Sequence, residues 1–132
     1  MDVRWSDFGF SGRDGKESTL WVGSSGANTP CHLDSYGCNL VLQVQGRKRW
    51  HLYPPEDSSF LYPTRIPYEE SSVFSKVNVV NPDLKHFPQF KKAQAHTVIV
   101  NPGQVISELG LSFILQLLEK YNVDSRKGRS VK

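Results

Sequence analysis

The sequence contains little cysteine and no long hydrophobic run. Its 132 residues include two cysteines, Cys31 and Cys38, which are too few for a disulfide framework. No stretch approaches the roughly 18 consecutive apolar residues that cross a bilayer. The opening residues MDVRWSDFGF also lack the basic start and apolar block of a secretory signal. We therefore expect no membrane partner, a cytoplasmic location and reduced thiols.

Excess charge is scarce too, except at the C-terminal end. The formal net charge is +3, and residues 119–132 account for all of it with five basic and two acidic side chains. The rest of the chain is neutral and has no basic face with interleaved aromatic residues, so a nucleic-acid partner is not expected. The basic end lacks apolar periodicity and predicts a flexible tail over residues 122–132.

Short strand-like stretches dominate the body of the chain, separated by turns that contain glycine or proline. Strand-forming residues predict strands over residues 19–22, 40–45, 49–53, 76–80 and 96–100. The second and third of these flank Gly46 and predict an antiparallel hairpin. Residues 101–104 predict a type II turn, in which Gly103 supplies the positive φ. The pattern is typical of an antiparallel barrel or sandwich, so the fold class is mainly β.

The pattern changes after residue 105. Apolar residues then recur at spacings of three or four, which predicts a C-terminal amphipathic helix over residues 106–121. The expected organisation is therefore an N-terminal extension (1–18), a strand-rich domain (19–105), the helix and the basic tail.

The most specific local feature is the pair His32 and Asp34. On an extended strand these residues project from the same face, and together they supply two-thirds of a 2-His-1-carboxylate iron site. The alternative is a local surface pair without function. Lys48 shares a strand face with Trp50 and Leu52, where a cation is costly unless it meets an anion or faces water. A third interpretation is zinc bound by Cys31, His32 and Cys38, at a spacing that matches no common zinc motif.

Five motifs follow one another between residues 20 and 105, in the order LWVGSSGANTPCHLD, NLVLQVQGRKRWHLYPPE, FLYP, NPDLKHFPQF and VIVNPGQV. Together they resemble the JmjC-type cupins, the branch that includes the asparaginyl hydroxylase of hypoxia factor. The resemblance implies a double-stranded β-helix, or jelly roll, that holds Fe(II) and uses 2-oxoglutarate as cosubstrate. It also implies protein hydroxylation as the activity and a small heat-shock protein as a partner.

The same resemblance assigns roles to five residues. His32 and Asp34 match the two iron ligands of the His-x-Asp motif. Lys48 matches the lysine that pairs with the distal carboxylate of 2-oxoglutarate, and Thr29 matches a hydroxyl that assists it. Asn39 matches a polar residue in the wall near the metal.

The chain departs from the family after its GQV motif. In the family a later strand supplies a histidine as third iron ligand, whereas here no histidine follows His96 and the equivalent position falls near Ile114. We therefore expect a truncated or alternatively spliced form, with a partial JmjC domain over residues 19–105 and a helix in place of the distal strands. Its hydroxylase activity is expected to be impaired or absent. The alternative is a non-catalytic module that binds a small heat-shock protein, and open sheet edges make self-association possible.

Overall fold

The computed structural model describes residues 4–13, 15–34, 38–66, 72–109 and 113–119 of the chain. Within these ranges the strands form two sheets in which every pairing is antiparallel. The larger sheet has the order β4-β5-β1-β8-β3-β6, and the smaller one pairs β2 with β7. The strands are β1 (His32–Asp34), β2 (Cys38–Leu42), β3 (Arg47–Tyr53), β4 (Pro63–Thr64), β5 (Ser72–Ser75), β6 (His96–Val100), β7 (Val105–Leu109) and β8 (Phe113–Glu119).

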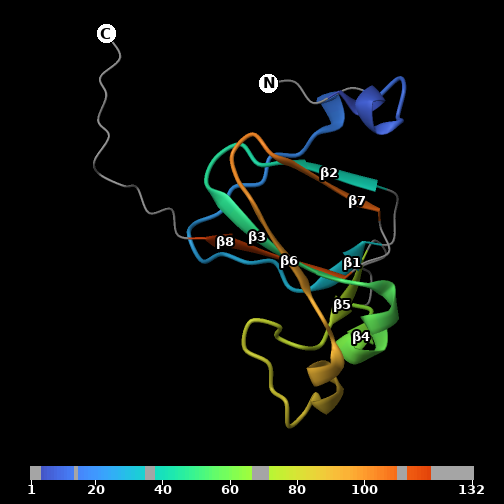
Figure 1. Ribbon diagram of the computed structural model, residues 1–132, viewed down its shortest axis with the longest axis vertical. Helices are drawn as coiled ribbons and strands as arrows, with labels where there is room; N and C mark the ends of the chain where they lie inside the picture. The colour runs from blue at the N-terminus through green and yellow to red at the C-terminus, as the bar shows by residue number, and fades with distance from the viewer. Residues whose placement is uncertain (1–3, 14, 35–37, 67–71, 110–112, 120–132) are drawn as a thin grey trace, which may run out of the picture.

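The two sheets pack face to face around one hydrophobic cluster. Trp50, Val100 and Ile114 are buried residues of the larger sheet, with exposures of 1%, 5% and 1%. Val41 of β2 and Ile106 of β7 pack against them from the smaller sheet. Figure 1 shows the β2–β7 pair lying across from β1, β3 and β8. This arrangement is a β-sandwich, in which apolar residues from both inner faces form the core.

A second cluster covers the opposite face of the larger sheet. Cys31, Tyr53 and Leu61 are its buried members, and Leu61 belongs to the short 3-10 helix η3 (Pro55–Leu61). Phe90, from the 3-10 helix η4 (Pro88–Lys92), packs against the same cluster. Cys31 and Tyr53 lie one residue away from His32 and Leu52, so strand alternation places them on the outer face. The remaining 3-10 helices, η1 (Trp5–Phe8) and η2 (Gly15–Glu17), belong to the N-terminal extension.

The predicted class is confirmed as mainly β, and two local predictions are matched closely. Strand β6 occupies residues 96–100 as predicted. Gly103 has a φ of 83°, and the backbone N–H of Gln104 donates to the carbonyl of Asn101 at 3.0 Å, as the predicted turn requires.

The predicted hairpin around Gly46 is wrong. Gly46 does adopt a positive φ of 75°, but the flanking strands enter different sheets. Strand β2 bonds to β7, whereas β3 bonds to β6 and β8. Pairing with strands more than 40 residues away in the sequence therefore overrides the local turn signal.

The other two strand predictions also fail. Residues 19–22 belong to no strand, and Leu20, Trp21 and Val22 are 77%, 75% and 87% exposed. Residues 76–80 belong to no strand either, and the strand of this region is β5, just before them.

The predicted helix over residues 106–121 is likewise corrected to two strands. Strand β7 pairs with β2 over five residue pairs, and β8 inserts between β1 and β3. A run that is apolar at most positions fits a helix by its spacing. It equally fits a strand that is covered on both faces of its sheet. Strand pairing determines the outcome here, because β8 forms backbone hydrogen bonds with two strands, each of which would otherwise have an unpaired edge. The predicted tail, residues 122–132, lies outside the described residues.

The helices within the described residues are all too short and too polar to cross a membrane.

Candidate functional site

His32 and Asp34 lie together on the inner face of β1. The His32 Nε2 atom is 3.5 Å from Asp34 Oδ1, and the two side chains are 16% and 11% exposed. His32 Nδ1 lies 2.8 Å from the carbonyl oxygen of Pro30. When Nδ1 carries the proton and donates it to this carbonyl, the lone pair of Nε2 faces the Asp34 carboxylate. The two side chains therefore present a ring nitrogen and a carboxylate oxygen to each other as potential metal donors.

The carboxylate of Asp34 is held by two neighbouring side chains. Asn39 Nδ2 donates to Oδ2 at 2.9 Å, and Ser72 Oγ donates to Oδ1 at 3.0 Å. Asp34 is only 8% exposed, so these hydrogen bonds offset much of the cost of burying the charge. Asn39 therefore lies next to Asp34, and its role near a metal stays a prediction. Ser72 could not be found from the sequence, because it reaches Asp34 only through the β1–β5 pairing.

Lys48 lies on the same face of the sheet as His32. His32 is the register partner of Ile114 on β8, and Lys48 is the partner of Leu118, four residues further along the same strand. Because the two partner positions on β8 are an even number of residues apart, His32 and Lys48 lie on one face of the sheet, about 13 Å apart along the direction of β8. The Lys48 ammonium leans over the ring of Trp50, 5.7 Å from its centroid. Burial lowers the pKa of Lys48.

Thr29 contributes a buried hydroxyl. Its Oγ1 atom is shielded from solvent and has no hydrogen-bond partner among the residues that the structure describes. A buried hydroxyl without a partner is costly, and a ligand that accepts a hydrogen bond would relieve that cost. The roles of Thr29, Asn39 and Lys48 toward 2-oxoglutarate remain predictions.

Ile114 lies where the family resemblance predicts the third metal ligand. It lies directly opposite His32 in the β1–β8 ladder, where side chains of paired residues lie about 5 Å apart. Ile114 is 1% exposed and packs with Trp50 and Val100, so hydrocarbon fills this part of the interior. The described part of the chain contains no cluster of three His, Cys, Asp or Glu side chains placed to share a metal ion. The donor set of these residues does not fit a 2-His-1-carboxylate iron site.

The zinc interpretation fails on the same geometry. Cys31 belongs to the outer cluster with Tyr53 and Leu61, on the opposite face of the sheet from His32. Cys38 lies on β2, where its sulfur is 3.8 Å from Ser107 Oγ. The two thiols and the imidazole therefore do not converge on one point.

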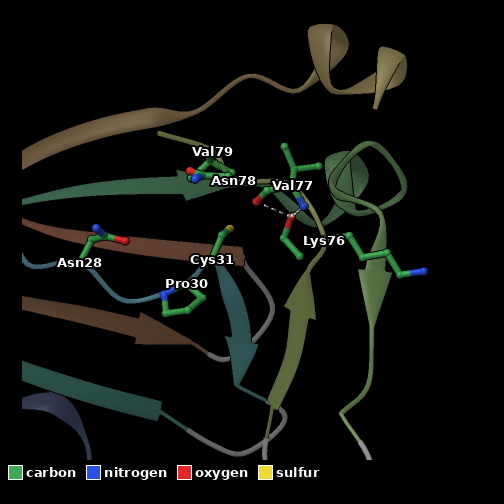
Figure 2. Close-up of a pocket in the computed structure, with 8 residues that line it drawn as sticks. Asn28, Pro30, Cys31, Lys76, Val77, Asn78 and Val79 are labelled. Carbon is green, nitrogen blue, oxygen red and sulfur yellow. Dashed lines mark hydrogen bonds between the residues drawn. The ribbon is translucent and has the colours of Figure 1, made fainter. Parts of the chain in front are cut away.

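A shallow cavity of about 280 Å³ opens beside Cys31 (Figure 2). Cys31 is 2% exposed, and burial raises the pKa of its thiol to about 12. Figure 2 shows the Lys76 side chain extending away from the cavity. A neutral thiol packed among aliphatic and aromatic side chains is a structural group, because reactive cysteines need a thiolate. The lining residues are Asn28, Pro30, Cys31, Ser75, Lys76, Val77, Asn78 and Val79.

The comparisons with known proteins agree with this fold. A family model described as a cupin-like domain matches residues 1–107. The chain therefore belongs to the cupin-like domain family, and the predicted kinship with JmjC-type cupins is confirmed. The matched region ends within β7, before the strand that carries Ile114.

Two groups of relatives are similar to the chain. HSPB1-associated protein 1 of Homo sapiens is 81% identical over 106 residues, which cover 80% of this chain and 22% of that protein. The HSPB1-associated protein 1 homolog of Danio rerio is 70% identical over 106 residues, covering 80% of this chain and 24% of the homolog. Lysine-specific demethylase 8 of Danio rerio is 36% identical over 108 residues, covering 80% of this chain and 26% of that protein. The chain thus spans about a quarter or less of the length of these relatives.

Removing the Ser72 hydroxyl should destabilise the protein. In Ser72→Ala the Asp34 carboxylate keeps the Asn39 hydrogen bond and loses the one at Oδ1, which should cost about 1–3 kcal/mol of unfolding free energy. Urea unfolding of the variant and the parent chain measures this difference. Ser58→Ala is the matched control, because that hydroxyl bonds a carbonyl on the exposed side of η3. Equal losses in the two variants would contradict the role given to Ser72.

The buried Cys31 thiol should make the fold sensitive to alkali. Its pKa is about 12 in the folded protein and near 9 when exposed, so its contribution to stability is complete below pH 9. That contribution is lost as the pH rises from 9 toward 12, because the unfolded chain releases this proton first. We expect the unfolding free energy to fall less steeply over this range in Cys31→Ala than in the parent chain or in Cys38→Ala. Equal slopes in all three proteins would contradict this prediction.

Proposed function

We propose that this chain keeps the architecture of an Fe(II)/2-oxoglutarate oxygenase but does not catalyse its reaction. The observation that carries the proposal is Ile114 opposite His32, with an apolar side chain where a third donor would be needed. The distant relatives with JmjC and demethylase names support the class of the architecture. Their activities belong to those proteins.

His32 and Asp34 form a half-site, which here means two of the three donor side chains of a 2-His-1-carboxylate site. His32 and Asp34 supply two donors, and both oxygens of Asp34 already accept hydrogen bonds from Asn39 and Ser72. A site with two donor side chains and an apolar third neighbour binds a divalent ion far more weakly than a site with three converging donors. Without a metal ion to chelate, 2-oxoglutarate would be held by Lys48 and Thr29 alone. A single partly exposed ion pair contributes no more than about 1 kcal/mol to binding.

Metal titration tests the proposal directly. We expect the parent chain to bind Mn(II) weakly under anaerobic calorimetry and to release no succinate when given Fe(II) and 2-oxoglutarate. Ile114→His should tighten Mn(II) binding at least tenfold, because the new imidazole lies across the ladder from His32. Sub-micromolar binding with succinate release by the parent chain would overturn the proposal.

Two controls separate metal binding from misfolding. Ile114→His places a polar group in the core, so circular dichroism must first show a folded variant, and added Mn(II) should raise its melting temperature. Combining Ile114→His with Asp34→Ala should abolish this rise, because the carboxylate donor is then missing.

As a second candidate function, we propose that the chain binds a small heat-shock protein. Several relatives with about 80% identity are named for association with HSPB1. The exposed segment Leu20-Trp21-Val22 offers three adjacent apolar side chains outside any strand. An exposed tryptophan between aliphatic neighbours is typical of the anchors that dominate binding energy at protein interfaces.

Substitution of the anchor tests this binding. Trp21→Ser should weaken binding of immobilised HSPB1 to the full chain at least tenfold in an interferometry titration. Val44→Ser is the control, because Val44 is 69% exposed and lies outside the segment. No binding by the parent chain, or equal binding by both variants, would contradict the candidate function.

A further inference from the structure

Strand β6 forms an unprotected edge of the larger sheet. Its only partner within the described residues is β3, to which five residues of β6 are paired. The opposite edge is β4, which is two residues long and begins with Pro63. Short edge strands and edge prolines are common means of preventing further pairing. Residues 94–100 (QAHTVIV) contain neither a proline nor a Lys, Arg, Asp or Glu.

The exposed side chains of β6 suit a strand partner. Val98 and Ile99 are each 40% exposed, and they project from opposite faces of the sheet. An added strand would cover apolar surface on both faces and would satisfy the open backbone groups at the same time. The four residues Thr97 to Val100 are β-branched, so the edge is well suited to strand pairing.

We propose that β6 pairs with β6 of a second copy of this chain, antiparallel and centred on Val98. A two-fold axis through Val98 then places Val98 opposite its own copy, Thr97 opposite Ile99 and His96 opposite Val100. No pair in this register brings like charges together, and every pair includes a β-branched residue.

Charge near the strand ends favours the antiparallel arrangement. Lys91 and Lys92 precede β6, and an uncharged turn over residues 101–104 follows it. In the antiparallel pair, the lysines of one copy lie beside the uncharged turn of the other. A parallel pair would bring all four lysines together, and such repulsion disfavours it.

The strength of this association follows from its size. A stable protein interface usually buries about 1,200–2,000 Å², and one five-residue strand from each copy provides less. We expect a weak dimer with a dissociation constant on the order of 10–100 µM.

Sedimentation of the full chain across that concentration range tests the proposal. The parent chain should shift from monomer to dimer as concentration rises. Val98→Lys and Val98→Glu should each weaken association at least tenfold, because like charges would meet at the axis. An equimolar mixture of the two variants should associate again, since the paired charges are then opposite. Val80→Lys is the control, because Val80 is 55% exposed in a turn away from β6.

Two outcomes would overturn the proposal. One is a parent chain that stays monomeric at every concentration. The other is a Val98→Lys variant that is folded by circular dichroism and dimerises as the parent does. If either Val98 variant does not fold, Ile99→Lys replaces it, because Ile99 lies on the outer face away from Trp50. Ile99→Lys should weaken association about fivefold, through repulsion between lysines diagonal to the axis, and unchanged association would overturn the proposal equally.

Discussion

The insertion of β8 between β1 and β3 determines the rest of the architecture. Because β8 bonds to both neighbours, it joins the strand that carries His32 and Asp34 to the strand that carries Lys48. Without it, β1 and β3 would each present an open edge, and the inner face would lose the residue that contacts both Trp50 and His32. The same insertion fixes Ile114 at the centre of the site. The strand that completes the sheet is therefore also the strand that places an apolar side chain opposite His32.

The remaining polar residues form a stable arrangement without an ion. Each oxygen of Asp34 accepts one side-chain hydrogen bond, and His32 is oriented by the Pro30 carbonyl. Buried charges are costly mainly when they lack partners, so this shell lets the half-site persist within a folded domain. Burial also shields the pair from partners in solution. These hydrogen bonds thus stabilise the buried carboxylate in the folded domain.

Strand periodicity was enough to predict part of the site. Residues two apart on a strand share a face, and this rule alone pairs His32 with Asp34 and Lys48 with Trp50. Ser72 was out of reach, because a serine in a distant strand has no local signal for the carboxylate that it contacts. The helix prediction for the segment from residue 106 is wrong, because apolar spacing does not distinguish a buried helix from a strand that is covered on both faces. Gly46 was misjudged for a related reason, because a correct turn signal does not say which sheet the next strand joins.

The distribution of polar and apolar groups favours recognition over chemistry. In the interior, Trp50, Val100 and Ile114 fill the space between the sheets, and the nearby carboxylate is already hydrogen bonded. At the surface, Leu20, Trp21 and Val22 are exposed, and the β6 edge lacks the charges and prolines that usually protect such strands. Apolar exposure of this kind favours association with a partner that covers it. These observations support the proposal that the surface of this domain binds other chains, and the apolar Ile114 opposite His32 supports the proposal that the chain does not catalyse an iron-dependent reaction.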